Sequence, residues 1–551
     1  MSRRGSLAAV APGMMGPMRF DACLAPGAAD EVGATAKPDA SSAPAAAAGA
    51  GGDHHAPLDP SAPGSLYEGE RTKEGKRQGR GAYAWRNGVA YSGEWRDDKM
   101  EGPGVMRYAD GTVCEGTWRN NRQHGRGKIV WPSGDSYEGD WEEDKRTGRG
   151  VYRWADGRRY EGEFVEGVRT GTGRCEWPDG TVYEGQWIDG LVDGLGTFWW
   201  ADGRKYEGTW TKGARTGHGS YTWPSGSVYV GEWKDGNREG YGCMYWAKSG
   251  DRYEGHWAND NLSGYGTYVW GDDAREYTGE WREGLRWGHG TMSYAEGDSY
   301  VGEWANDKRE GHGQCTWADG RVYRGAWRAN FRCGLGKMTW PCGALYEGQW
   351  DNNKFNGHGV YSWADGRRYV GQLKDGMRWG KGFMVYADGD TYEGSWRENK
   401  ADGPGSYVEA DGTRYQGHWQ GGKRHGAGAL RWTDGRRYDG QWRDDKRCGN
   451  GRMVFAVGDV FDGHWQDDKR NGWGVYIHWD DGQRYYGHYR NDKRHGSDGV
   501  LVTDTHYTGG DRLLVEYKEG ALQRSRRMAA DYEISMMSFS GLPYRTHTLR
   551  Y

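Results

Sequence analysis

Aromatic and charged residues alternate along short stretches of the chain. In Tyr137–Trp141, the residues Tyr, Gly and Trp take every second position, and Glu138 and Asp140 stand between them. This period of two predicts a β-strand with one aromatic face and one charged face. An amphipathic helix would instead repeat its apolar residues every three or four positions.

The residues that follow predict a second strand and two turns. The polar stretch EEDKRT, residues 142–147, is interpreted as a turn, and Gly148–Trp154 as the second strand. Asp156 and Gly157 then close that strand, because the primed turns of tight hairpins need residues that tolerate a positive φ. The predicted unit is a β-hairpin that leads directly into the next hairpin.

This hairpin is repeated along most of the chain. Its first residue stands at nineteen positions: 67, 91, 114, 137, 160, 183, 206, 229, 253, 277, 300, 323, 346, 369, 392, 415, 438, 461 and 485. Such a period indicates a repeat protein in which neighbouring units bury one continuous core. The predicted fold is all-β, an elongated single-layer twisted antiparallel sheet of tandem β-hairpins.

The composition explains how so polar a chain can have a core. Its 551 residues include 97 glycines and 32 tryptophans, the apolar fraction is 35% and the mean hydropathy is −1.02. Glycine has no Cβ, so a large ring from an adjacent strand can lie flat on its backbone. We therefore expect Tyr and Trp rings to pack over the repeated glycines.

Three segments are predicted along the chain. Residues 1–66 are rich in Ala, Gly, Pro, Ser and Asp and lack an apolar period. They predict a flexible low-complexity tail, and a transit peptide is the alternative. Residues 67–520 form the array, which ends in a closing half-repeat at 513–520. Residues 521–551 form a tail that either folds over the last strands or binds a partner.

The charge pattern excludes several classes of protein. The net charge is −4, and 74 basic and 78 acidic residues are interleaved, whereas nucleic-acid-binding proteins carry a basic face. The eight cysteines show no C-x-x-C spacing and are interpreted as reduced thiols. No stretch approaches the roughly 18 apolar residues of a membrane span. These features predict a soluble, cytoplasmic protein that does not bind nucleic acid.

The repeated phrase Y-x-G-x-W-x-x-G/D-x-x-x-G-x-G-x-x-x-W-x-D-G resembles the MORN (membrane occupation and recognition nexus) repeat over about residues 67–520. The resemblance implies a solenoid-like ribbon of hairpins with an aromatic-lined groove, used as a scaffold or adaptor for helical or extended partner segments. In some plant proteins such repeats precede a phosphatidylinositol phosphate kinase domain, but the segments outside this array are too short for one. The departures from the pattern are Cys114, Phe461, Phe164, Leu373, Tyr489 and Glu409.

Catalytic and metal sites are not expected. The G-x-G motifs open strands and lack the helix N-terminus that gives phosphate loops their positive potential. Equivalent histidines of successive repeats would lie about 9 to 10 Å apart, too far to share one zinc ion. Repeated acid pairs in exposed turns share one solvated environment, so their pKa values are not separated for catalysis. The chain is predicted to be no enzyme and to need no cofactor or metal.

Three sets of residues are candidate contact sites. The partner-binding groove is predicted at Tyr206, Trp210, Trp223, Tyr229, Trp233, Tyr300, Trp304, Trp317, Tyr323, Trp327 and Trp340. Trp287 and Trp379, outside the repeat scheme, are predicted to be exposed contacts. A column of turn arginines could face anionic lipids, each worth about 1 kcal/mol, although adjacent acids oppose it. That column includes Arg146, Arg309, Arg424, Arg447, Arg470 and Arg494.

The leading hypothesis from the sequence is a non-catalytic scaffold that docks partner proteins, or a second copy of itself, along the aromatic groove. Its expected setting is the cytoskeleton, a cilium or flagellum, or the cell cortex. The alternative is a peripheral membrane protein that binds anionic phospholipids such as phosphoinositides through its basic turns. A phosphatidylinositol 4-phosphate 5-kinase activity is disfavoured because no kinase domain is present.

Overall fold

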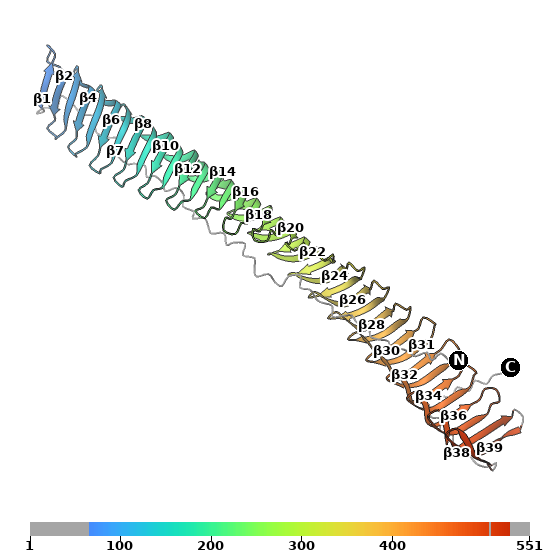
Figure 1. Ribbon diagram of the computed structural model, residues 1–551. Coiled ribbons are helices and arrows are strands. Elements are labelled where there is room, and N and C mark those ends of the chain that lie inside the picture. Colours follow the sequence, from blue (N-terminus) through green and yellow to red (C-terminus); the bar gives the residue numbers. More distant parts are fainter. Residues whose placement is uncertain (1–65, 506–507, 529–551) are drawn as a thin grey trace. The chain divides into compact units, whose positions relative to one another are not determined.

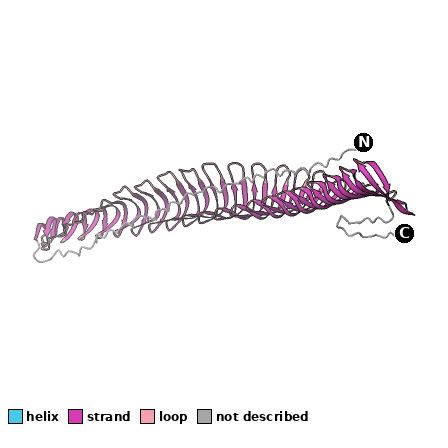
Figure 2. Cartoon of the chain, turned by 90° about the horizontal axis from the view of Figure 1, so that it is seen from below, coloured by secondary structure: helices cyan, strands magenta, loops and turns pink. Residues whose placement is uncertain are grey.

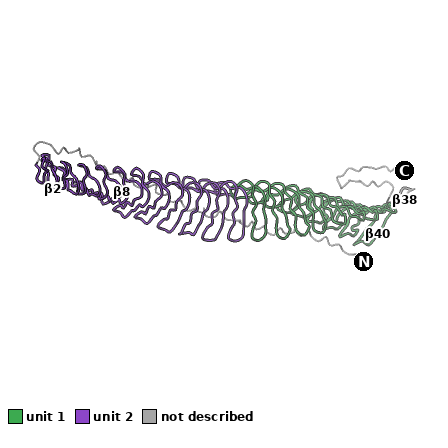
Figure 3. The backbone as a smooth tube through the Cα atoms, turned by 90° about the horizontal axis from the view of Figure 1, so that it is seen from above, with its two compact units in different colours: residues 1–26, 309–551 green, residues 27–308 purple. Residues whose placement is uncertain are grey.

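The computed structural model describes residues 66–505 and 508–528. These residues form forty β-strands and no helix, which confirms the predicted all-β class. Strand is the regular structure seen in Figure 2, and every described strand pair is antiparallel. The chain divides into two compact units, residues 27–308 and residues 1–26 with 309–551 (Figure 3). The predicted tail of residues 1–66 lies outside the described residues except for Leu66, and so do residues 529–551.

The unit of residues 27–308 is an open sheet in which each strand pairs with the next (Figure 1). Its strands are β1 (Leu66–Arg71), β2 (Arg77–Ala84), β3 (Ala90–Arg96), β4 (Lys99–Arg107), β5 (Val113–Arg119), β6 (Arg122–Val130), β7 (Ser136–Glu142), β8 (Lys145–Arg153), β9 (Arg159–Val165), β10 (Val168–Glu176), β11 (Val182–Ile188), β12 (Leu191–Trp199), β13 (Lys205–Thr211), β14 (Ala214–Thr222), β15 (Val228–Lys234), β16 (Asn237–Tyr245), β17 (Arg252–Ala258), β18 (Asn261–Val269), β19 (Glu276–Arg282), β20 (Leu285–Ser293) and β21 (Ser299–Ala305).

The second unit continues the same hairpin pattern. Its strands are β22 (Lys308–Thr316), β23 (Val322–Arg328), β24 (Phe331–Thr339), β25 (Leu345–Asp351), β26 (Lys354–Ser362), β27 (Arg368–Lys374), β28 (Met377–Val385), β29 (Thr391–Arg397), β30 (Lys400–Val408), β31 (Arg414–Gln420), β32 (Lys423–Arg431), β33 (Arg437–Arg443), β34 (Lys446–Val454), β35 (Val460–Gln466), β36 (Lys469–Ile477), β37 (Arg484–Arg490), β38 (Lys493–Thr505), β39 (Thr508–Lys518) and β40 (Ala521–Arg527). The strand β40 extends the sheet beyond the predicted half-repeat.

The two turns of each hairpin are of different kinds, and the sequence interpretation assigned them wrongly. Only Glu143 and Asp144 connect β7 to β8, with φ values of 52° and 66°, so they form the primed two-residue turn. The loop at Asp156 and Gly157 has three residues: Trp154 N–H donates to Arg158 O at 2.9 Å, and Gly157 N–H donates to Trp154 O at 3.0 Å. This is a type I turn followed by a left-handed glycine.

Paired glycines run across the strands as a continuous column. Gly139 lies opposite Gly150, which lies opposite Gly162 on its other side. The Tyr137 ring covers the first two, and its hydroxyl donates to Asp140 O at 3.0 Å. The prediction that rings lie over bare main chain is confirmed. One tyrosine covers a glycine of its own strand and a glycine of the adjacent strand.

In each hairpin the strand pairing shifts register beside the G-x-G motif of the second strand. Between β7 and β8 the pairing jumps after Gly139, and Gly148 adopts a φ of 54°. The shift frees the N–H of Arg149, which donates to the Asp140 carboxylate at 3.1 Å. The acids and amides at this strand position therefore satisfy a backbone donor that the ladder leaves unpaired.

Candidate binding surfaces

The predicted aromatic groove is a packed core. All its proposed residues are buried except Trp223 and Trp340, which are half-buried. The Tyr206 ring makes T-shaped contacts with Trp210 and Trp233, with 5.0 Å and 5.4 Å between ring centroids. Burial raises the pKa of Tyr206 well above its usual value. Because these rings are already covered by one another, they leave little surface for a partner.

The turn arginines complete this core and do not form an exposed rim. Arg146, Arg309 and Arg424 are buried, and Arg447, Arg470 and Arg494 are half-buried. The reason is the short turn. The turn has only two residues, so these arginines lie within the second strand, an even number of residues before the inward-facing glycines. They are therefore on the aromatic face.

Each arginine is held by the following repeat. The Arg309 guanidinium carbon lies 4.4 Å from the centre of the Trp327 ring, and Arg309 Nη2 donates to Asn330 O at 3.3 Å. The same arrangement places Arg215 over Trp233 at 4.5 Å. Desolvation lowers the pKa of Arg215, which shows that burying its charge is costly. The ring face and the turn carbonyl offset this cost.

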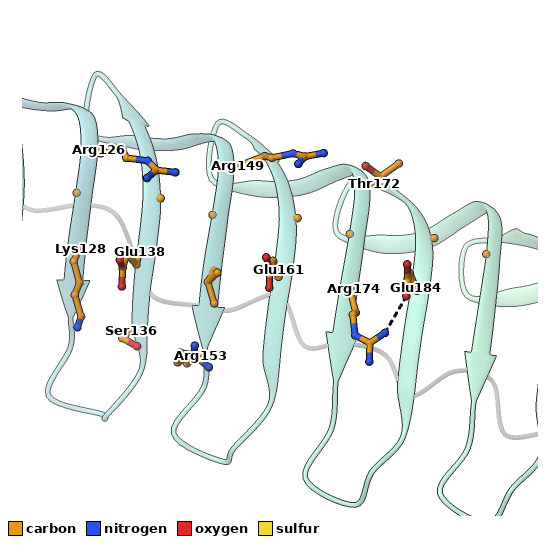
Figure 4. A pocket seen from close by; sticks show the side chains of 18 of the residues that line it. Arg126, Lys128, Ser136, Glu138, Arg149, Arg153, Glu161, Thr172, Arg174 and Glu184 are labelled. Atoms are coloured by element: carbon orange, nitrogen blue, oxygen red, sulfur yellow. Dashed lines mark hydrogen bonds and ion pairs between the residues drawn. The ribbon is translucent and has the colours of Figure 1, made fainter.

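A groove lies on the opposite, charged face of the unit of residues 27–308 (Figure 4). It encloses about 1480 Å³, and its floor includes the glycine column from Gly116 to Gly208. Glu138 and Glu161 stand on one side and Arg126 and Arg149 on the other. Sequence reasoning missed this groove, although the charged face of each strand and the glycine period together were signals for it.

Exposed apolar residues continue the columns that line this groove. Leu195 is a groove-lining residue and is 64% exposed. In later repeats of the same unit, Tyr241 and Tyr265 take the equivalent position before the second glycine of the motif, and they are 46% and 59% exposed. Arginines are confined to the earlier repeats of this column, and the later repeats carry Leu195, Tyr241 and Tyr265 together with His218 and His289, so different repeats offer different contact chemistry.

Comparison with known proteins agrees with this geometry. The MORN repeat model matches nineteen segments between residues 73 and 497: residues 73–89, 91–113, 114–136, 137–158, 160–182, 183–203, 206–228, 229–250, 253–275, 277–299, 300–320, 323–343, 346–367, 369–391, 392–414, 415–436, 438–460, 461–484 and 485–497. The chain belongs to the MORN-repeat family. All the matched segments are repeat units, and none is a catalytic domain. No curated protein matches the sequence.

Solved structures resemble this MORN-repeat protein only weakly. The TCP10c domain of Drosophila melanogaster Sas-4 is 15% identical, with a TM-score of 0.19 over 31% of this chain and 100% of that chain. The TCP10 domain of Danio rerio CPAP with a STIL peptide is 13% identical, with a TM-score of 0.14 over 48% of this chain and 99% of that chain. A streptogramin B lyase is 13% identical, with a TM-score of 0.11 over 56% of this chain and 95% of that chain. At these TM-scores the matches carry no argument about function.

Five tryptophans lie outside the regular positions of the MORN repeats: Trp199, Trp287, Trp379, Trp473 and Trp479. Trp287 and Trp379 are half-buried, and each is covered by a cation of its own hairpin: Arg282 lies 5.0 Å and Lys374 5.1 Å from the ring centre. Trp479 is 72% exposed. The position that holds the second Trp in other repeats is taken here by His478, whose N–H donates to Gln483 O at 2.9 Å.

The described part of the MORN array contains no cluster of three or more His, Cys, Asp or Glu side chains that could hold a metal ion. His289, one of the repeated G-H-G histidines, is exposed on the charged face and pairs across the strands with Glu303. Among the described residues there is no helix that is long and apolar enough to cross a membrane.

Proposed function

We propose that this MORN-repeat protein is a non-catalytic scaffold that binds extended segments of partner proteins along its charged, glycine-floored groove. The observation that carries the proposal is the groove from Glu115 to Gly208, which repeats the same lining over successive hairpins. Its floor has no side chains, so a polypeptide can approach the sheet closely. The docking face therefore differs from the aromatic face that the sequence favoured.

The lining residues fit a partner segment of mixed charge. Glu138 and Glu161 recur at every second strand, about 9 to 10 Å apart, and basic residues such as Arg149 stand across the floor. A partner that carried both signs at this spacing would find complementary groups in several repeats, and many weak contacts would add up to affinity. The exposed Tyr241 and Tyr265 supply apolar anchors farther along.

The proposed setting is cytoplasmic, at the cytoskeleton, a cilium or the cell cortex, and a second copy of the chain is one candidate partner. Burial of Arg146, Arg309 and Arg424 speaks against the membrane alternative, because a buried guanidinium cannot reach lipid headgroups. Association with anionic vesicles that disappears with added salt would favour the membrane function instead.

The test is proximity labelling in the native cell with matched charge reversals. The groove variant combines Glu138→Lys, Glu161→Lys and Glu184→Lys. The control combines Glu143→Lys, Glu166→Lys and Asp189→Lys, which are exposed turn positions of the same hairpins. Lysine is tolerated at this turn position, since Lys212 occupies it with a φ of 49°. We expect only the groove variant to lose its labelled neighbours. An equal pattern for both variants would contradict the proposal.

A further inference from the structure

One position on the aromatic face holds arginine in most repeats and another residue in six. The exceptions are Met100, Gln123, Val192, Leu262, Phe355 and Ala401. Alanine is the smallest of these. A cavity of about 310 Å³ lies at Ala401, lined by residues of the second unit. It has the position that a guanidinium occupies in the repeats before and after it.

The flanking repeats show what this position binds. Arg378 lies 4.2 Å above the Trp396 ring, and its Nη2 donates to Asn399 O at 2.9 Å. Arg424 lies 4.5 Å above Trp442, and its Nη2 donates to Asp445 O at 3.1 Å. Each guanidinium thus uses one indole face and one turn carbonyl of the following repeat.

The equivalent groups are present around Ala401. Tyr392, Trp396 and Trp419 line the cavity, and the Trp419 ring takes the place of the indole beneath the absent guanidinium. The turn of the following repeat is Gly421-Gly422, and Gly422 N–H donates to Ala401 O at 2.8 Å. The Gly422 carbonyl therefore corresponds to the acceptors at Asn399 and Asp445.

The Trp419 indole differs from its neighbours in a second way. Trp396 Nε1 donates to Gly382 O at 3.2 Å, and Trp442 Nε1 donates to Gly428 O at 3.2 Å. Trp419 is only 8% exposed, yet its Nε1 has no hydrogen-bond partner among the described residues. A buried donor without an acceptor is costly.

We propose that this cavity binds the guanidinium of an arginine from a partner polypeptide, stacked on Trp419 and hydrogen-bonded to Gly422 O. Aromatic faces attract cations most strongly when both are removed from water. The cavity lies in the second unit, on the aromatic face of its own strands. The inference rests on the proposed scaffold function only for the source of the arginine.

The cavity is lined by four basic side chains and one carboxylate, and the carboxylate of Asp445 is paired with Arg424 at 3.3 Å. Arg367, Arg378, Lys400, Lys423 and Asp445 line it. Arg367 is paired with Asp365 at 2.7 Å, so its charge is balanced locally. Successive arginines at this spacing also occur without an intervening gap elsewhere on the same face, at Arg424, Arg447 and Arg470. A guanidinium at Ala401 would restore that regular series.

The test uses the full chain and two matched probes, N-acetyl-arginine amide and the uncharged N-acetyl-citrulline amide, observed by saturation-transfer NMR. We expect the arginine probe to bind at least about tenfold more tightly, because citrulline lacks the charge that the rings attract. Equal signals from the two probes would overturn the inference.

Two substitutions to arginine locate the site. Ala401→Arg supplies the missing side chain internally and should abolish probe binding. Val192→Arg makes the same change at the equivalent position of another repeat and should leave binding at Ala401 intact. Ala401→Met fills the cavity without charge and gives a second variant if the first does not fold. Binding that persists in both Ala401 variants would overturn the site.

The outcomes also separate this inference from the proposed scaffold function. Probe binding at Ala401 with unchanged labelling in the groove variant would keep the arginine site and reject the groove. Loss of labelling in the groove variant without any probe binding would do the reverse.

Discussion

The close contact between tyrosine and glycine makes a sharp prediction for Gly150→Ala. An added Cβ would lie 2.5 Å from Tyr137 Cζ. The ring has no room to retreat, because Tyr137 is fully buried and its hydroxyl donates to Asp140 O. Either the ring or the strand must shift, so the substitution should weaken this hairpin.

Gly127→Ala is the matched control. Gly127 has the same place in the preceding repeat, but Cys114 stands where Tyr137 stands, and the nearest atom to an added Cβ is Trp141 Cδ1 at 3.1 Å. Overpacking costs typically about 1–3 kcal/mol, and we expect Gly150→Ala to reach the upper end. Loss of freedom in the unfolded chain offsets about 0.4–1 kcal/mol in both variants. Gly127→Ala, with its nearest contact at 3.1 Å, should lie at the lower end of that range, so the expected difference between the two variants is about 2 kcal/mol.

Hydrogen exchange measures this difference locally, which suits a repeat protein whose units can open separately. A loss of about 2 kcal/mol should speed exchange in β7 and β8 by roughly 30-fold, since about 1.4 kcal/mol is tenfold. The double variant Tyr137→Cys with Gly150→Ala should lose the clash and show coupling between the two sites. Equal protection in Gly150→Ala and Gly127→Ala would refute the reasoning.

Three further predictions concern Arg309, Glu409 and Cys175. Arg309→Ala should lower the free energy of unfolding by about 2–3 kcal/mol, whereas Arg309→Met, which copies Met100, should lose less because the side-chain stem still packs; denaturant titration checks both. Burial raises the pKa of Glu409 above 4.5. The Glu409 carboxyl therefore favours the folded protein below that pH, and the folded protein loses this stability as pH rises through the folded-state pKa. Glu409→Gln should accordingly stabilise the protein at pH 7 and have no such effect at pH 3. A pH series of thermal midpoints with the same difference at both pH values would contradict this. Burial raises the pKa of the Cys175 thiol to about 11, so a thiol reagent at pH 8 should label the exposed Cys342 first and Cys175 only after unfolding, as mass spectrometry of labelled peptides would show.

The sequence predicted the features that depend on neighbouring residues in one strand. Tyr137 and Trp141 alternate with charged residues, so the strand, its faces and the repeat followed directly. The packing of rings on glycine also followed, because only glycine lacks the Cβ that would collide. These features are local and recur in most repeats, the repeat that begins at Cys114 being an exception.

The positions of the arginines could not be found while residues 142–147 were assigned to a turn. Counting back by twos from Gly150 through Gly148 reaches Arg146, so a longer strand would have placed it on the aromatic face. The cavity at Ala401 required more. It depends on a small residue in one repeat and Gly422 in the next, and their proximity is set by strand pairing that single-repeat patterns do not contain.

Each arginine contacts the repeat that follows it in the chain, so the contacts between repeats all run in one direction along the sequence. Arg215 rests on Trp233 and on the Gly236 carbonyl, which both come later in the chain. During synthesis the earlier repeat emerges first, and its guanidinium stays uncovered until the next hairpin leaves the ribosome. Assembly would thus proceed from the amino end, and each new repeat would cover the arginine of the repeat before it. At Ala401 this contact between successive repeats is missing.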